Sequence, residues 1–118
     1  EALKAADTRG DGPSEVMLRQ ALQWLDSDVD RGYRELLKVT KAEDRAKYVP
    51  SALEVHLLYA RSFFRRWPID GTTRTAMDFY AARCRETWVQ RSLQEQAMLA
   101  LAFDRSGDKT TARLILKS

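Results

Sequence analysis

One cysteine and one histidine are the residues of this sequence whose chemistry could support catalysis or metal binding. Cys84 and His56 could form a dyad in which the imidazole activates the thiol as a nucleophile. Both look like core residues on two separate predicted helices, so we expect each to pack in the core, with His56 hydrogen-bonded there. A single cysteine excludes an internal disulfide, and this pair excludes a metal site with several such ligands. We therefore predict no catalytic, cofactor-binding or metal-binding residue.

Arginines raise the question of nucleic-acid binding. Four cluster near one expected helix junction and four more could extend a basic surface: Arg61, Arg65, Arg66 and Arg74, then Arg83, Arg85, Arg91 and Arg105. However, the chain has 20 Lys and Arg residues and 17 Asp and Glu residues, which leaves a net charge of only +3. No helix-turn-helix, zinc-finger or RNA-binding signature is present. We expect a solvated or partner-facing surface and no nucleic-acid partner.

Other signatures of enzymes are missing from the sequence. It has no glycine-rich phosphate loop, no nucleophile elbow and no paired His–Glu metal motif. Four aromatic residues, Tyr59, Phe63, Phe64 and Trp67, recur at helical spacing in one hydrophobic segment. This spacing predicts core packing, with a ligand pocket as the alternative. We therefore interpret the chain as non-enzymatic.

The elements that carry these residues are predicted to be helices. The 118 residues suffice for one domain with a core. Leu and Ala dominate the apolar set and no alternating strand pattern is found, so the predicted fold class is all-α. Glycine and proline breaks, together with apolar periodicity, predict five helices at about residues 14–39, 52–66, 73–89, 93–106 and 109–117.

Local signals mark several helix ends. The Ser-x-x-Glu strings at 51–54 and 92–95 each fit a capping box, in which a hydroxyl and a carboxylate satisfy free backbone N–H groups. Gly107 is predicted to be a left-handed C-terminal stop, followed by Asp108 as the cap of the last helix. The polar stretch 40–49 is interpreted as a linker. No apolar run approaches the roughly 20 residues of a membrane span, so we expect no membrane insertion.

The helices differ in how much of their surface is apolar. Those at 14–39 and 73–89 are amphipathic, whereas those at 52–66 and 93–106 are apolar on most faces and should be largely buried. Such alternation is typical of antiparallel helix pairs stacked in two layers. The candidates are an α/α toroid and an α-solenoid. A simple four-helix bundle ranks third, because its helices would carry similar stripes.

Several strings in the sequence are more specific than this periodicity. They are Leu57–Phe64, Ala76–Tyr80 with Trp88, Gln96–Ala102 and Arg105–Ala112. In this order and spacing they resemble a segment of large bacterial α2-macroglobulin-like proteins, over roughly residues 14–118. The segment is similar to the helical domain that holds the thioester in complement and macroglobulin relatives. The resemblance implies that residues 1–118 are a single helical domain and a fragment of a larger α/α toroid.

The family also suggests a role. In that family a protease cuts a bait segment, the molecule rearranges and the helical domain is repositioned. The resemblance therefore implies a scaffold and conformational relay in a protease-trapping inhibitor. It also implies a periplasmic or cell-surface location, where the parent protein could carry a lipid anchor. The partners would be other domains of the parent chain and, through the parent, proteases.

A family thioester needs the string Cys-x-Glu-Gln, in which the glutamine side chain acylates the thiolate. The nearest string here, Leu93–Gln96, begins with leucine, and Cys84 is not followed by Glu and Gln at the required positions. We therefore expect no thioester in this segment. The chain begins at Glu1 and ends shortly after the apolar run Leu114–Leu116, which indicates a piece of a longer polypeptide. In isolation such a piece should expose apolar surface and form a homodimer to cover it.

A tetratricopeptide-like repeat module that binds proteins is the alternative function. Residues from Ala100 to Ala112 fit half of such a unit, but no second copy at a 34-residue spacing is found. This alternative predicts helix pairs of matched length. It also predicts a concave groove lined by side chains such as Tyr59 or Arg61.

Overall fold

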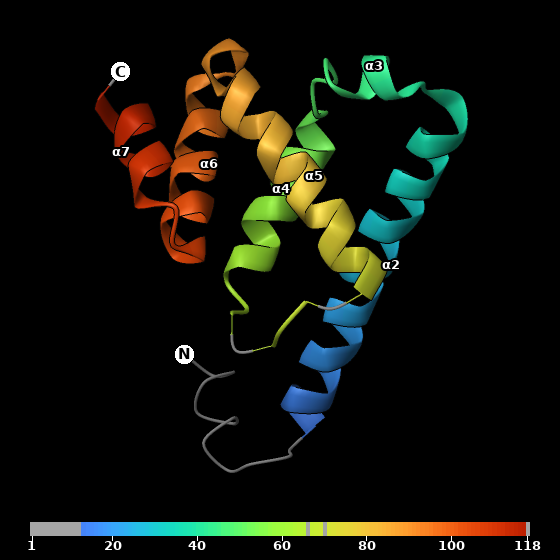
Figure 1. Cartoon of the computed structure of the whole chain (residues 1–118). Coiled ribbons are helices and arrows are strands. Elements are labelled where there is room, and N and C mark those ends of the chain that lie inside the picture. The colour runs from blue at the N-terminus through green and yellow to red at the C-terminus, as the bar shows by residue number, and fades with distance from the viewer. Residues whose placement is uncertain (1–12, 66, 70, 118) are drawn as a thin grey trace.

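Helices make up all the regular structure in the part of the chain that the structure describes. The computed structural model describes residues 13–65, 67–69 and 71–117. In chain order the elements are α2 (Pro13–Val39), α3 (Ala42–Arg45), α4 (Ala52–Ser62), α5 (Gly71–Thr87), the 3-10 helix η1 (Trp88–Gln90), α6 (Leu93–Ser106) and α7 (Lys109–Lys117) (Figure 1). The prediction of an all-α fold is confirmed.

Most predicted helix bounds agree with the structure. The helices predicted at 14–39, 93–106 and 109–117 are found within one residue of those bounds. The helix predicted at 73–89 begins at Gly71 instead and continues after Thr87 as η1. The stretch 40–49 is not only a linker, because it holds the short α3. The first turn of α3 carries two acidic side chains, which the helix dipole favours there.

The helix predicted at 52–66 is too long, because α4 ends at Ser62. The guanidinium of Arg61 donates hydrogen bonds to the backbone carbonyls of Phe64 (2.8 Å) and Trp67 (2.7 Å). Pro68 follows, and a proline disfavours helical conformation in the residue before it. The chain that leaves α4 therefore wraps around one arginine side chain instead of continuing the helix.

Both predicted capping boxes are present. Oγ of Ser51 accepts a hydrogen bond from the N–H of Glu54 (3.2 Å), and the Glu54 carboxylate accepts one from the N–H of Ser51 (2.8 Å). Ser92 and Glu95 repeat this exchange at the start of α6, at 3.2 and 3.4 Å. The two helices therefore begin with the same device, which satisfies backbone donors that no helical turn can satisfy.

The junction between α6 and α7 also agrees with the prediction. Gly107 ends α6 with φ +96°, a left-handed conformation that glycine adopts without steric strain. The Asp108 carboxylate then caps α7 by accepting from the N–H (3.2 Å) and the hydroxyl (2.7 Å) of Thr111. This turn folds α7 back against α6.

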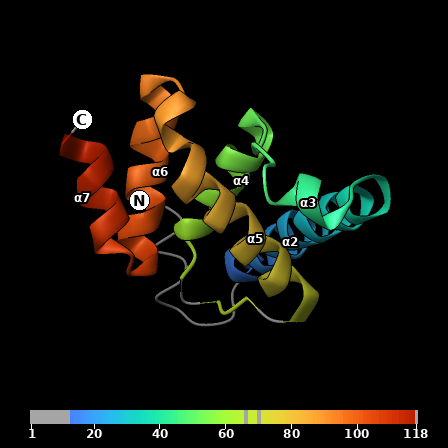
Figure 2. The ribbon, with the colours of Figure 1, turned by 45° about the horizontal axis from the view of Figure 1, so that its top comes forward.

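The central helix is α4, which packs against α2, α5 and α6. Figure 2 shows α6 and α7 on one side of it and α2 on the other. In Figure 1, α4 and α6 run in one direction, whereas α2, α5 and α7 run in the opposite direction. Helices consecutive along the chain are therefore antiparallel from α4 onward, and α4 and α6 are parallel neighbours.

The buried side chains form two clusters that meet at α4. One joins α4 to α7 through residues that include Val55, Cys84, Leu99, Phe103 and Ile115. The other joins α2 to α5 through Val29, Ala76, Met77 and Tyr80. Leu58 packs against both clusters. The two helices predicted to be amphipathic, at 14–39 and 73–89, supply all four of these buried residues, as expected for helices with one apolar face.

The prediction that α4 and α6 are largely buried is only partly correct. In α4, only Val55 and Arg61 are buried, and Leu53 is 67% exposed. In α6 the buried side chains lie toward its C-terminal half, whereas Leu93 is 84% exposed and Leu101 44% exposed. Among the described residues no neighbouring helix covers these leucines. Each of the two helices therefore buries one face and leaves apolar side chains on another.

Candidate functional site

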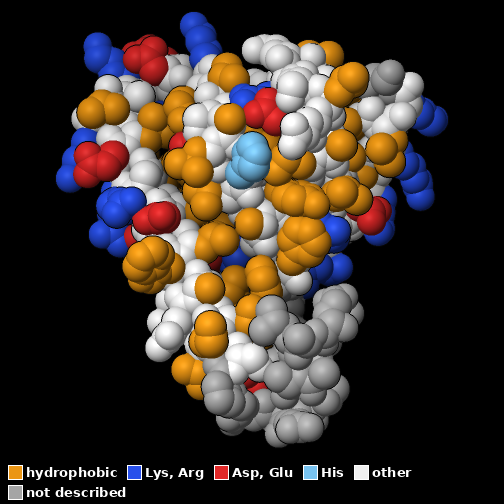
Figure 3. Space-filling view, turned by 180° about the vertical axis from the view of Figure 1, so that it is seen from behind, with side chains coloured by type: hydrophobic (Ala, Val, Ile, Leu, Met, Phe, Trp, Pro, Cys, Tyr) orange, Lys and Arg blue, Asp and Glu red, His pale blue; other side chains and the backbone are white. Residues whose placement is uncertain are grey.

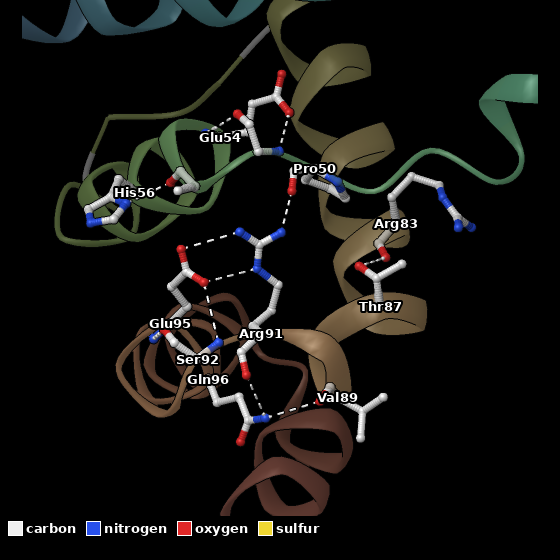
Figure 4. A network of polar contacts seen from close by, with 12 residues as sticks. Pro50, Glu54, His56, Arg83, Thr87, Val89, Arg91, Ser92, Glu95 and Gln96 are labelled. Atoms are coloured by element: carbon white, nitrogen blue, oxygen red, sulfur yellow. Dashed lines mark hydrogen bonds and ion pairs between the residues drawn. The ribbon is translucent and has the colours of Figure 1, made fainter.

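The first polar site links the N-termini of α4 and α6. Figure 4 shows the Arg91 guanidinium between the carboxylate of Glu95 and the backbone carbonyl of Pro50, and it donates hydrogen bonds to both. This arginine lowers the pKa of Glu95, whose carboxylate also serves as the capping group of α6. Pro50 lies directly before the cap of α4, so one side chain holds the two helix starts together.

The second polar site lies at the other end of α4. Arg61 is 4% exposed, although the sequence predicts it on a solvated or partner-facing surface and as a candidate groove residue. Its guanidinium pairs with Asp26 of α2 and donates to carbonyls of the chain that follows α4. A buried charge is tolerated where it is paired and hydrogen-bonded in this way. Arg61 is therefore a structural residue, and the expectation that it lies on a solvated or partner-facing surface was wrong.

The remaining arginines do not form one basic surface in the described part of the chain. Arg83 donates to the Tyr48 carbonyl at 2.8 Å, and Arg85 pairs with Asp108 at 2.7 Å. The guanidinium of Arg105 lies 4.0 Å from the centroid of the Phe63 ring, a cation–π contact. Most of these charges are therefore used within the fold. Arg66, which the sequence analysis also names, lies outside the described residues.

Cys84 and His56 do not form a dyad. Cys84 is fully buried, and burial raises the pKa of its thiol to about 12, so the thiolate is scarce at neutral pH. His56 is exposed on α4, and its Nδ1 lies 2.6 Å from the carbonyl oxygen of Ala52. The expectation of core packing was therefore wrong for His56 and is confirmed for Cys84. Within the described residues no three His, Cys, Asp or Glu side chains are placed to hold a metal ion.

A cleft of about 360 Å³ lies between α4, α5, α6 and the described residues 64–65 and 67–69 that follow α4. Its apolar lining includes Trp67, Met77 and Phe103, and its polar lining includes Arg65 and Arg74. The prediction that the aromatic segment packs in the core is corrected. Phe63 is 54% exposed, and Phe64 and Trp67 line the cleft instead. No local signal in the sequence indicated this, because α4 ends where Arg61 meets backbone carbonyls beyond the helix.

A face of α4 and α6 is exposed and apolar, and we call it the apolar α4 face. It carries the exposed Leu53 and His56 and the half-buried Ala60 of α4, followed by the exposed Phe63 at the C-cap, which recur at spacings of three and four, and the exposed Leu101 of α6. Figure 3 shows it from behind the view of Figure 1, where hydrophobic side chains surround the pale-blue histidine. A contiguous patch of this kind indicates a surface that packs against another partner.

Comparison with known proteins yields no relative: no family model, curated protein or solved structure matches the chain. In the described residues, no helix has both the length and the apolar character needed to cross a bilayer. The polar contacts above are accounted for by helix caps, ion pairs and links between helices. The features that remain for function are the apolar α4 face and the cleft.

Proposed function

We propose that this chain is a non-enzymatic scaffold segment of a bacterial α2-macroglobulin-like protease-trapping protein. Its helices would form part of an α/α toroid, and its role would be to pass a rearrangement from one domain of the parent to another. The observation that carries the proposal is the apolar α4 face, which needs a covering partner. The family is suggested by the strings in and around helices α4, α5 and α6, which resemble α2-macroglobulin-like proteins.

The direction of the helices supports a two-layer arrangement. In such an arrangement, alternate helices of the chain are parallel and lie in the same layer. The parallel direction of α4 and α6, which the Arg91 link joins, is consistent with that arrangement. The molecule measures 48 × 37 × 20 Å, and its smallest dimension accommodates about two helix diameters. In the proposed toroid, further helices of the parent would continue both layers and cover the exposed leucines.

The region of α6 that contains Glu and Gln supports the absence of a thioester in this segment. Leu93 stands where a thioester would need cysteine. Glu95 is occupied with Arg91 and the cap of α6, and the Gln96 side chain donates to the carbonyl of Arg91 at 3.2 Å. These side chains serve local structure. We therefore propose that this segment contributes packing and not covalent capture.

The tetratricopeptide-like alternative is less well supported. Its matched helix pairs are not found in the described part of the chain, since α2, α4, α5, α6 and α7 have 27, 11, 17, 14 and 9 residues. The guanidinium of Arg61 is buried and hydrogen-bonded to backbone carbonyls, so it is not available to hold a bound protein segment. Tyr59 packs edge-on against Phe63, with ring centroids 5.0 Å apart.

The proposal also places the parent protein in the periplasm or at the cell surface, and it predicts how that protein treats a protease. The full-length protein should be cut by trypsin at one accessible segment and then change its hydrodynamic radius. The captured trypsin should still cleave small substrates and lose activity on large ones, because a trap restricts access. Full-length protein that is degraded without any loss of trypsin activity on large substrates would contradict the proposal.

A matched pair of variants connects that assay to this segment. Leu53→Ser combined with Leu101→Ser should weaken the size change, because both side chains would lose their apolar partner. Val39→Ser is the control, since Val39 is 77% exposed at the end of α2 and away from the apolar α4 face. Equal behaviour of the two proteins would show that the face has no role in the rearrangement.

A further inference from the structure

The cleft between α4, α5 and α6 combines an apolar floor with basic side chains at its edge. Leu58, Met77 and Leu99 line it together with the rings of Trp67 and Phe103. Its volume of about 360 Å³ lies at the lower end of the range for ligand sites. A cleft of this size accommodates one large apolar side chain with its backbone, and it is too small for a folded element.

The four arginines that line the cleft differ in what they are already bound to. Arg61 is neutralised by Asp26 and backbone carbonyls. Arg85 is held at 2.7 Å by Asp108, which also caps α7. These two charges are committed to the fold, so they are not available to a ligand.

The other two arginines remain available. Arg65 is exposed and has no ion pair or hydrogen bond with a described residue. Arg74 lies 3.3 Å from Asp78, and both side chains are more than 60% exposed, at 62% and 68%. An exposed pair of this kind is weak and exchanges readily with another carboxylate. Among the residues that the structure describes, the edge of the cleft therefore offers one free guanidinium and one exchangeable guanidinium.

We propose that this cleft binds an acidic peptide segment, which inserts one aromatic or aliphatic side chain and places flanking carboxylates on Arg65 and Arg74. The apolar floor requires the inserted side chain, and the two available guanidinium groups match carboxylates. Asp78 and Asp108 line the same cleft and pair with Arg74 and Arg85, which leaves too little free positive charge for the phosphate backbone of a nucleic acid. This inference rests on the cleft alone and does not depend on the proposed function.

Binding can be measured by fluorescence anisotropy with a labelled peptide, Glu-Glu-Phe-Glu-Glu, at low ionic strength. The two matched probes are Lys-Lys-Phe-Lys-Lys and Glu-Glu-Ala-Glu-Glu. We expect the first peptide to bind more tightly than both probes, and we expect added salt to weaken it. Equal affinity for the acidic and the basic peptide would overturn the proposal, as would equal affinity with and without the phenylalanine.

Two variants should move the affinity in opposite directions. Arg65→Ala should weaken binding of the acidic peptide about three- to fivefold, as expected for loss of an exposed ion pair. Asp78→Asn should strengthen it, because Arg74 would no longer be paired. Arg113→Ala is the control, since Arg113 is exposed on α7 and does not line the cleft. Unchanged affinity in both cleft variants would contradict the proposal, and circular dichroism would verify that each variant is folded.

Discussion

Nε of Arg61 lies 3.0 Å from Oδ1 of Asp26, and the two residues are 35 positions apart in the chain. The arginine side chain is 4% exposed and the aspartate side chain 23% exposed. The same guanidinium holds the chain that leaves α4, including the carbonyl of Trp67. One buried side chain therefore joins α2, α4 and a wall of the cleft.

Arg61→Ala should lower the free energy of unfolding by about 3 kcal/mol, because it leaves Asp26 and several carbonyls without their donor. Urea denaturation monitored by circular dichroism measures this change. Arg31→Ala is the matched control, since Arg31 pairs with Asp28 at 2.8 Å but both side chains are exposed. The control should cost at most about 0.5 kcal/mol. Similar values for the two variants would show that burial of Arg61 does not matter.

Two glycines should respond to alanine in opposite ways. Gly107→Ala should destabilise by about 1 kcal/mol, because its φ of +96° is unfavourable for a residue with a Cβ atom. Gly32→Ala should stabilise by about 0.5–1 kcal/mol, because Gly32 lies within α2. A Cβ there would lie 3.7 Å from the Tyr80 hydroxyl, an ordinary contact. Destabilisation by Gly32→Ala would contradict the packing of α2 on α5.

The buried thiol predicts a loss of stability in alkaline solution. The pKa of Cys84 rises from its ordinary 9.0 to about 12, mainly through burial. The folded state therefore keeps the proton longer, so this stability is fully present below about pH 9 and is lost as the pH rises from 9 to 12. Tyr48 and Tyr80 act in the same direction, because burial also raises their pKa values.

Cys84→Val separates the thiol from the tyrosines. The free energies of unfolding of the unsubstituted chain and the variant should diverge above pH 9. Only the unsubstituted chain has a thiol that ionises on unfolding, and this ionisation lowers its stability. The difference should approach about 1.4 kcal/mol per pH unit. Parallel stability curves from pH 8 to 11 would mean that the thiol ionises as easily in the folded state as in the unfolded state.

The ion pair at the start of α6 predicts that the stability of the fold decreases at acidic pH. Nε and Nη2 of Arg91 lie 3.1 and 3.2 Å from the two carboxylate oxygens of Glu95, and this contact lowers the pKa of Glu95. Its contribution is therefore present at neutral pH and is lost as the pH falls through the lowered pKa. Glu95→Gln should cost about 0.5–1 kcal/mol at pH 7, and the cost should shrink in acid. A cost that is the same at pH 7 and pH 2 would contradict this role.

The starts of α4 and α6, the end of α6 and the apolar helix faces could be predicted from the sequence, because each depends on residues that are close together in the chain. The capping boxes, Gly107 and the apolar stripes act within a few residues, and all were confirmed. The length of α4 could not be predicted in this way. It depends on Arg61 meeting backbone carbonyls beyond the helix and an aspartate 35 residues earlier.

The candidate sites were less accessible to sequence reasoning, because exposure is a property of the whole arrangement. The apolar surface of α4 predicted burial, yet Leu53 and His56 are exposed in this chain. The aromatic residues after α4 predicted core packing, yet Phe64 and Trp67 line the cleft. In both cases the apolar residue types indicated a surface that packs against something. Their spacing did not indicate what covers that surface.

The most direct test of the scaffold proposal is the reactivity of a thiol placed on the apolar α4 face. Leu53→Cys should react rapidly with iodoacetamide in the isolated chain, because position 53 is 67% exposed there, while the buried Cys84 gives a slow background. In the full-length protein, covered by the helices that complete the toroid, the same thiol should react at least about tenfold more slowly. Equal rates in the isolated chain and the full-length protein would contradict the proposal that this face packs within a larger helical domain.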